Sequence, residues 1–322
     1  MLAAFAHATS ADDPVSALSV GERPEPIPPD GWVPITVRAA SLNHHDVWTL
    51  RGAVTPAGGL PCVLGTDAAG VDDDGNEYVI HGVLGDPARG RGDETLDPER
   101  SVLSDAGHGT LAARIVVPRR NLVPKPAELS WAEAACLPTA WLTAYRMLFT
   151  KARARPGDRV LVQGAGGGVA TAAILLARAA GLWVRVVTRD PAKADRAAEL
   201  GAHEVVMSGT RLPSDCDVVL DTVGQATWKS SLGAVRPGGT VVLSGATTGF
   251  DAPTNLARLF SRQINVLGST MGTRTELEDL IGFLVAGGVR PLVDSVAPLD
   301  SAGEQFSRLL SGQVFGKVVV EP

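Results

Sequence analysis

The sequence has few cysteines and no excess of basic charge. Its three cysteines, Cys62, Cys136 and Cys216, are too few and too far apart for a disulfide framework or a cysteine-only zinc site. The formal net charge of −6 leaves no basic excess for binding nucleic acid or an anionic membrane. We therefore expect reduced thiols and no nucleic-acid partner.

Long hydrophobic runs are also absent. No stretch approaches the roughly 18 uncharged apolar residues of a membrane span, and the N-terminus lacks the basic and apolar regions of a signal peptide. These absences predict a soluble, cytoplasmic protein with no membrane partner. A length of 322 residues with 45% apolar residues predicts two domains, each able to build a core.

The first 125 residues read as a β-rich domain. Short β-branched runs such as Trp32–Val37, Tyr78–Val83 and Arg114–Val117 are separated by glycine, proline and aspartate, which is typical of short strands joined by turns. The segment Gly85–Gly109 is polar, charged and rich in glycine, and we expect it to be a long surface loop.

The pattern changes near residue 129. A helix is predicted over Trp131–Thr150, opened by a capping box of Ser130 and Glu133. Beyond it, apolar runs alternate with helical segments as far as Ile264–Leu267. Such alternation is typical of an α/β domain with a doubly wound parallel sheet covered on both faces.

A glycine-rich turn lies between the first strand and the first helix of this alternation. Glycines let the backbone approach a pyrophosphate, and the N-terminus of the helix offers free N–H groups and a positive dipole end. Tight packing of strand on helix could also demand glycine, but the context favours a dinucleotide site. The predicted cofactor-binding residues here are Gly164, Ala165, Gly166, Gly167, Gly168 and Val169.

The end of the second strand indicates which dinucleotide binds. Thr188 stands where NAD-binding proteins usually carry an acid, and Arg189 and Lys193 follow it. Asp190 precedes Pro191 and suits the role of helix N-cap. Arg189 and Lys193 could instead be a solvated surface pair. We predict that they bind the 2′-phosphate of NADPH.

Several motifs together resemble the medium-chain dehydrogenase/reductase superfamily. They are 39–48, Arg51-Gly52, 61–71, 121–126, 134–145 and the AGGGVA turn, in this order and spacing. The resemblance covers nearly the whole chain and is nearest to the quinone oxidoreductase branch. It implies a GroES-like β-rich domain over 1–126 and 272–322, a Rossmann domain over 127–271, and a homodimer, to which the apolar strand Ile264–Leu267 could contribute a sheet edge.

The resemblance also indicates which residues stand at the zinc positions of the superfamily. Asn43, Thr66 and Thr139 align with the usual catalytic zinc ligands, and only Asp67 remains of the acidic partner. Amides and hydroxyls are not zinc ligands of the usual type, so we predict no metal. Adjacent His44 and His45 are expected on a strand-like segment, where they would point to opposite faces and could not bind one ion.

The first of these motifs supplies the candidate catalytic residues. Asn43 could donate its amide to a carbonyl or to the cofactor, or could be a structural turn amide. His44 falls where related enoyl reductases often carry a tyrosine proposed as proton donor, and an imidazole can do that work, although a structural role is equally open. Asp46 is expected to fix the local loop or orient a neighbour.

Later loops complete the predicted cofactor site, because ligands bind at the carboxyl ends of parallel strands. Ordinary turn chemistry is the alternative for each residue. The predicted residues are Thr139, Thr143, Ser244, Gly245, Ser269, Thr270 and Met271.

Without zinc, a simple ketone would lack strong stabilisation of its developing alkoxide, whereas a quinone or enone spreads that charge by conjugation. The sequence therefore predicts an NADPH-dependent, zinc-independent oxidoreductase that transfers a hydride to a quinone or an α,β-unsaturated carbonyl, its small-molecule partner. The alternatives are a catalytically idle NADPH-binding protein and a non-redox enzyme on the same scaffold.

Overall fold

A computed structural model describes residues 1–54 and 56–322, and these divide into two units. Unit 1 comprises Met1–Leu142 and Gly272–Pro322, and unit 2 comprises Thr143–Met271. Residues 127–142, which were expected in the second domain, group with unit 1 rather than with unit 2.

Unit 2 is built on a six-stranded sheet in the order β13-β12-β11-β14-β15-β16, and every neighbouring pair is parallel. This is the Rossmann strand order, which places a crevice between β11 and β14. The bounds of the strands are β11 Arg159–Gln163, β12 Trp183–Thr188, β13 Glu204–Met207, β14 Cys216–Asp221, β15 Val235–Leu243 and β16 Asn265–Gly268.

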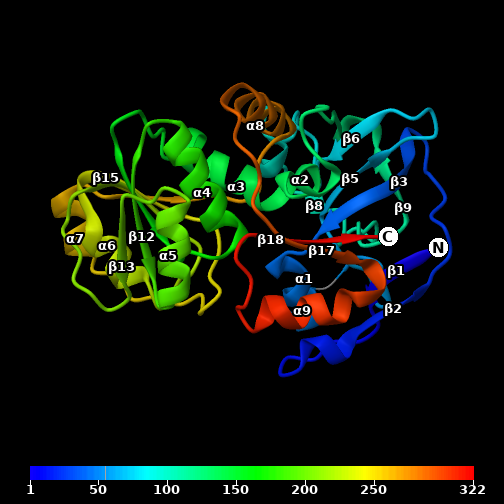
Figure 1. Ribbon diagram of the computed structural model, residues 1–322, viewed down its shortest axis with the longest axis horizontal. Helices are drawn as coiled ribbons and strands as arrows, with labels where there is room; N and C mark the ends of the chain where they lie inside the picture. The colour runs from blue at the N-terminus through cyan, green and yellow to red at the C-terminus, as the bar shows by residue number, and fades with distance from the viewer. Residues whose placement is uncertain (55) are drawn as a thin grey trace. The chain divides into compact units, whose positions relative to one another are not determined.

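Helices cover both faces of this sheet, as the continuous apolar runs predict (Figure 1). The helices α4 (Gly168–Ala179) and α5 (Pro191–Glu199) pack on one face, and α6 (Trp228–Ala234) and α7 (Leu256–Arg262) on the other. Trp228 and Leu232 of α6 join a core cluster with residues of four strands, including Leu161. The doubly wound α/β architecture expected from the sequence is therefore present.

Unit 1 is the β-rich part (Figure 1). Its main sheet has seven strands in the order β10-β6-β5-β3-β18-β17 with β9 beside β3, and β2-β1-β4 and β7-β8 form smaller sheets. The bounds are β1 Leu2–Ala6, β2 Leu18–Glu22, β3 Trp32–Ser41, β4 Cys62–Val63, β5 Asp67–Val71, β6 Glu77–Ile80, β7 Val83–Leu84, β8 Ser101–Val102, β9 Arg114–Pro118, β10 Leu122–Pro124, β17 Val293–Pro298 and β18 Lys317–Glu321.

The helices of unit 1 come from widely separated parts of the chain. They are α1 His44–Leu50, α2 Trp131–Ala135, α8 Arg274–Gly287 and α9 Ala302–Leu310, with shorter turns η1 Pro14–Ala17, η2 Glu94–Leu96, η3 Arg119–Asn121, η4 Leu137–Trp141 and η6 Leu299–Ser301. The terminal strand β18 returns to pair with β3, so the end of the chain lies in the sheet that carries the first motif.

The helix predicted over Trp131–Thr150 is not continuous. Ser130 and Glu133 do form the expected capping box, but α2 passes into the π-helical turn η4, then α3 (Leu142–Tyr145) and a second π-helical turn, η5 (Arg146–Lys151). Pro138 lies in η4 and has no N–H for a regular helical hydrogen bond. The expectation of one regular helix was therefore wrong.

The segment Gly85–Gly109 is more ordered than a surface loop. It contains η2 and β8, and the carboxylate of Asp97 is fully buried within it. Both oxygens of Asp97 accept from the Arg89 Nε, at 3.1 and 3.2 Å, and one accepts from the Asp86 N–H at 2.7 Å. The charge and glycine content of the segment predicted a surface loop, but the segment folds around the buried carboxylate of Asp97.

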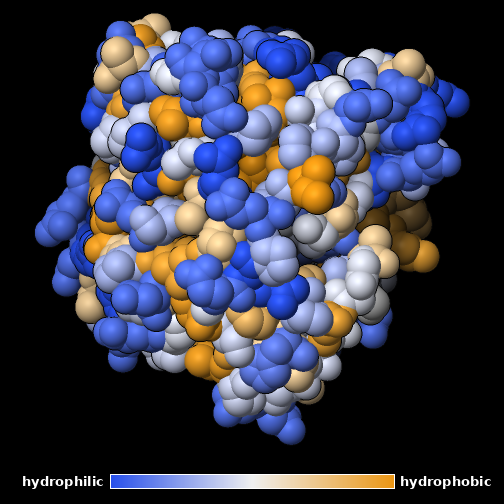
Figure 2. Space-filling model, turned by 90° about the vertical axis from the view of Figure 1, so that its right-hand side faces the viewer, coloured by the Kyte–Doolittle hydropathy of each residue, from blue (hydrophilic) through white to orange (hydrophobic). Residues whose placement is uncertain are grey.

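Figure 2 shows a face on which hydrophobic residues are scattered among hydrophilic ones. Within the described ranges, no helix is long and apolar enough to cross a membrane. All three cysteines are free and buried, as expected for reduced thiols.

Candidate functional site

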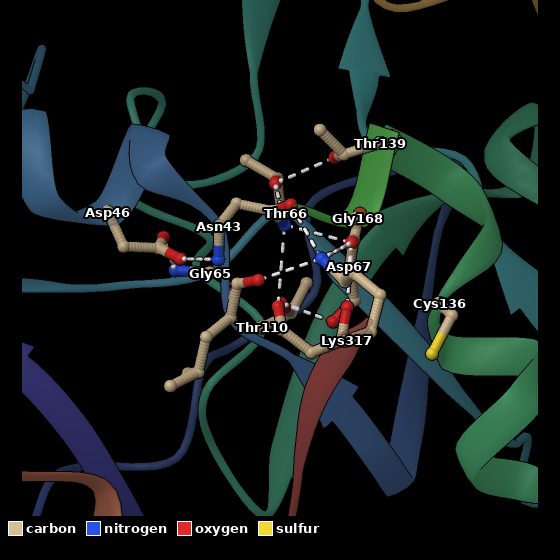
Figure 3. A network of polar contacts seen from close by, with 12 residues as sticks. Asn43, Asp46, Gly65, Thr66, Asp67, Thr110, Cys136, Thr139, Gly168 and Lys317 are labelled. Atoms are coloured by element: carbon tan, nitrogen blue, oxygen red, sulfur yellow. Dashed lines mark hydrogen bonds and ion pairs between the residues drawn. The ribbon is translucent and has the colours of Figure 1, made fainter. Parts of the chain in front are cut away.

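Three strands of unit 1 bring the residues of the first motif together. The last residue of β3, Ser41, pairs with Asp67 at the start of β5 and with Val319 of β18. Lys317 begins β18 and extends into the same region (Figure 3). The strand register thus places segments far apart in sequence around one polar network.

A buried ion pair forms the centre of this network. The Lys317 Nζ lies 3.3 Å from the Asp67 Oδ2, and both side chains are almost completely buried. The ammonium also donates to the Leu42 carbonyl at 2.7 Å and to the Asn43 Oδ1 at 2.6 Å. Three acceptors therefore hold the charge of Lys317, which offsets its desolvation.

The amide of Asn43 is fixed by these contacts. Because an ammonium can only donate, the atom facing Lys317 must be the Asn43 oxygen. The amide nitrogen then donates to the Asp67 Oδ2 at 2.8 Å and approaches the Thr66 Oγ1 at 3.4 Å. Asn43 was expected either to donate to substrate or cofactor or to be a structural amide, and the structure directs its amide into the protein.

The residues at the superfamily's zinc positions lie close together. Thr66 and Thr139 share a hydrogen bond of 3.0 Å between their hydroxyls, and Asn43 adjoins Thr66 (Figure 3). An amide, two hydroxyls and one carboxylate do not supply the donors of a zinc site. The carboxylate already binds the Lys317 ammonium, and among the described residues no group of three or more His, Cys, Asp or Glu could hold a metal ion. The site does not fit zinc.

Asp46 supports the backbone around this network. Its two oxygens accept from the Asn43 N–H at 2.8 Å and the Gly65 N–H at 2.9 Å, which links the start of α1 to the turn before β5. Complete burial raises the pKa of Asp46 to about 6, against the opposing effects of His45 and of these hydrogen bonds. This geometry suits the expected role of fixing the local loop.

His44 and His45 lie on a helix, not on a strand-like segment as expected. They are the first residues of α1, because Asp46 closes a helical turn back onto Asn43. His44 is exposed, but the surrounding protein and the charges of Lys317 and Arg51 lower its pKa. His45 contacts Asp105 at 3.3 Å, and although burial opposes the charged ring, this partner raises its pKa.

The glycine turn of unit 2 fits a dinucleotide. Gly164 directly follows β11 with φ +91°, a left-handed conformation that favours glycine, and Gly167 caps α4. A Cβ added to Gly167 would meet nothing within 4 Å, so protein packing does not demand glycine there. That open space before a helix N-terminus is suited to a phosphate. Ala165 is buried within the turn, and Val169 follows Gly168 into the first turn of α4.

The residues expected to determine the preference between NADPH and NADH lie at the end of β12 and the start of α5. The Asp190 carboxylate accepts from the N–H groups of Ala192, at 3.0 Å, and Lys193, at 3.4 Å, so it is the predicted N-cap of α5. Arg189 is exposed beside buried Thr188. The Lys193 Nζ lies 2.8 Å from the position of a Cβ on Gly166, so this side chain reaches the glycine turn.

The remaining predicted cofactor residues of unit 2 mostly follow the strands at the same edge. Ser244 and Gly245 come after β15, and Ser269, Thr270 and Met271 come after β16. The Ser269 Oγ is buried and has no hydrogen-bond partner among the described residues. Thr143 is buried in α3.

Lys317 is the residue of the candidate site that the sequence interpretation missed. The available signal was a lysine opening an apolar terminal strand, Lys317-Val318-Val319-Val320, whose residues are all buried. A charged residue in such a strand needs a buried partner.

Family models match both parts of the chain. A model described as "Alcohol dehydrogenase GroES-like domain" matches residues 29–127, and one described as "Zinc-binding dehydrogenase" matches residues 168–286. A 2-methylene-furan-3-one reductase of Solanum lycopersicum is 33% identical over 89% of this chain and 71% of its own length. The chain belongs to the medium-chain dehydrogenase/reductase superfamily.

Other similar proteins of the superfamily are named for different oxidoreductase activities. A quinone oxidoreductase of Mus musculus is 27% identical over 89% of this chain and 88% of its own length. A structure of an NAD-dependent alcohol dehydrogenase is 35% identical, with a TM-score of 0.91 and complete coverage of both chains.

Two further structures hold a metal or a cofactor. A cobalt- and zinc-bound alcohol dehydrogenase of Pyrobaculum aerophilum is 30% identical, has a TM-score of 0.90, and is matched over 100% of this chain and 99% of its own. A 2-octenoyl-CoA carboxylase reductase in complex with NADP and 2-octenoyl-CoA is 26% identical, has a TM-score of 0.89, and is matched over 99% and 87%. The family is one of nicotinamide-dependent oxidoreductases.

Proposed function

We propose that this protein is an NADPH-dependent, zinc-independent oxidoreductase that transfers a hydride to a quinone or an α,β-unsaturated carbonyl compound. The observation that carries the proposal is the chemistry at the zinc positions. Asn43, Thr66 and Thr139 are bonded into one network there, and a buried ammonium already neutralises the nearby carboxylate. Such a site can offer hydrogen bonds to a carbonyl oxygen, but it cannot bind a Lewis-acidic zinc ion.

The substrate class follows from this loss. A hydride that arrives on a conjugated carbonyl leaves a charge spread over several atoms, which hydrogen bonds can stabilise. A simple ketone concentrates the charge on one oxygen, where zinc is worth several kcal/mol. The tomato and mouse relatives, whose names specify a furanone reductase and a quinone oxidoreductase, support this class.

The choice of NADPH is supported by the end of β12. The Oδ1 of Asp190 caps α5, which gives this acid a structural role at the end of β12. Exposed Arg189 and the Lys193 ammonium above the glycine turn would instead hold the 2′-phosphate and the pyrophosphate. When bound, NADPH supplies the hydride. His44, exposed at the start of α1, would return a proton to the reduced substrate.

The protein is further proposed to act as a homodimer in the cytoplasm. The edge strand β16 and the preceding α7 expose apolar side chains, with Val266 39%, Phe260 75% and Leu256 69% accessible. Pairing this edge with its copy would cover unpaired backbone groups and apolar surface together. Three free, buried thiols suit a reducing compartment.

Absorbance at 340 nm in the presence of NADPH or NADH tests the proposal. We expect NADPH consumption with 1,4-benzoquinone and cyclohex-2-enone, slower consumption with NADH, and very little with cyclohexanone. Tight NADPH binding without consumption on any conjugated substrate would instead identify a catalytically idle binding protein.

A further inference from the structure

The polar network of unit 1 runs from a buried charge to a partly exposed threonine. Lys317 is 3% exposed, Asp67 0%, Asn43 7% and Thr66 1%. Thr139 is only half-buried. Of the linked side chains Lys317, Asn43, Thr66 and Thr139, the last is therefore the one that a bound molecule can reach.

The hydrogen bonds between these residues link the ammonium to the Thr139 hydroxyl. Lys317 donates to the Asn43 Oδ1, so the Asn43 amide nitrogen faces Asp67, at 2.8 Å, and the Ser41 carbonyl and Thr66 Oγ1, both at 3.4 Å. The Thr66 and Thr139 hydroxyls lie 3.0 Å apart, and either can be the donor. When Thr66 donates, the Thr139 hydroxyl proton points away from the network.

We propose that Thr139 is a catalytic residue whose hydroxyl donates a hydrogen bond to the substrate's carbonyl oxygen, oriented and polarised by Lys317 through Asn43 and Thr66. The inference rests on the proposed reduction of a conjugated carbonyl. It assigns to Thr139, predicted from the sequence as a cofactor contact, the task of stabilising negative charge as hydride arrives. No proton is transferred between the linked side chains. Each hydrogen bond only becomes stronger as the substrate's carbonyl oxygen gains negative charge.

Lys317, Asn43 and Thr66 are positioning residues in this arrangement. A buried ammonium at the far end favours polarisation of every donor toward the accessible hydroxyl. Replacing Lys317 would leave Asp67 buried without its counter-charge and would destabilise unit 1. The informative substitutions are therefore those of Thr66 and Thr139 by valine, which has nearly the same shape as threonine but lacks the hydroxyl.

The experiment measures kcat, KM and NADPH affinity with cyclohex-2-enone as the probe. Thr139→Val should lower kcat about 10²-fold, the usual cost of one oxyanion donor, while NADPH binding stays unchanged. Thr139→Ser keeps the hydroxyl and should restore the rate to within a few-fold. Thr66→Val should lower kcat less, and the double variant Thr66→Val/Thr139→Val should be no slower than Thr139→Val alone.

Thr49→Val is the matched control, because the Thr49 hydroxyl is also buried but bonds a carbonyl within α1, at His45. We expect its kcat to equal that of the unchanged protein. An unchanged rate in Thr139→Val, equal losses in the valine and serine variants, or a parallel loss of NADPH affinity would each overturn the assignment. Failure of the unchanged protein to reduce any conjugated carbonyl would instead refute the proposed function.

Discussion

At the scale of single residues, we propose that the exposed guanidinium of Arg189 favours NADPH over NADH. Arg189 follows Thr188 at the end of β12 and can form charge-assisted hydrogen bonds to a 2′-phosphate, each worth about 1.5–3 kcal/mol. Arg189→Ala should therefore weaken NADPH binding about ten- to a hundredfold and leave NADH binding nearly unchanged, as measured by fluorescence titration. Arg196→Ala, on the exposed face of α5, serves as the control. Equal losses for both cofactors would contradict the role of Arg189.

A second prediction concerns His44 as the proton donor to the enolate that forms after hydride transfer. Its lowered pKa makes the imidazole mostly neutral at pH 7, so the acidic form gains population as pH falls. If His44 protonates the enolate, kcat on cyclohex-2-enone should rise toward acidic pH, and His44→Gln should lower it about 10²-fold and remove that dependence. Reduction of 1,4-benzoquinone should change much less, because solvent protonates the quinone oxygen. An unchanged enone rate would remove His44 from the mechanism.

Among the elements, the segment Gly85–Gly109 depends on the carboxylate of Asp97. The Arg89 hydrogen bonds and the Asp86 N–H lower the pKa of Asp97 to about 2, below its ordinary 3.8. Its stabilising contribution is therefore complete above about pH 4 and is lost as pH falls from 4 to 2. Thermal unfolding should show a lower Tm for Asp97→Asn at pH 7 and a smaller difference from the unchanged protein near pH 2.

Glu99 offers a matched comparison, because it pairs with the same Arg89 at 2.7 Å but is 72% exposed. Glu99→Gln should leave Tm nearly unchanged, as exposed ion pairs contribute little. Equal effects of the two substitutions would show that burial of Asp97 does not organise the segment.

The elements of unit 2 could be predicted from sequence more fully than those of unit 1. Runs such as Val160–Val162 are buried on both faces, so their local composition already specifies a parallel sheet. The short helix α1 was not predicted because it begins soon after β3, with two histidines and an aspartate that give no apolar periodicity. Its start depends on Asp46 bonding back to Asn43.

The candidate site was predictable where its residues are close in sequence. The glycine turn and the Asp190 cap belong to local motifs, and the structure places them as expected. The Lys317 network joins residues about 250 or more positions apart, and its partners are set by the pairing of β18 with β3 and of β3 with β5. No local pattern encodes that register, so Lys317 emerged only from the structure.

For the whole molecule, the edge of the unit 2 sheet predicts self-association. Substitution of Val266 by lysine places a charge in the proposed seam between two copies of β16 and should shift sedimentation at micromolar concentration from dimer to monomer. Ile27→Lys, at an 88% exposed position in unit 1, should leave the dimer intact. A monomeric unchanged protein would contradict the proposed assembly.

We propose that NADPH reduces conjugated carbonyls here while hydrogen bonds, rather than zinc, stabilise the charge that develops on the carbonyl oxygen. The most direct test combines elemental analysis of the purified protein with its rate of NADPH-dependent cyclohex-2-enone reduction before and after dialysis against EDTA. With Asn43, Thr66 and Thr139 at the zinc positions and Lys317 paired to Asp67, we predict far less than one zinc per chain and the same rate after dialysis. One tightly bound zinc per chain, with activity lost on its removal and regained on its return, would contradict the account.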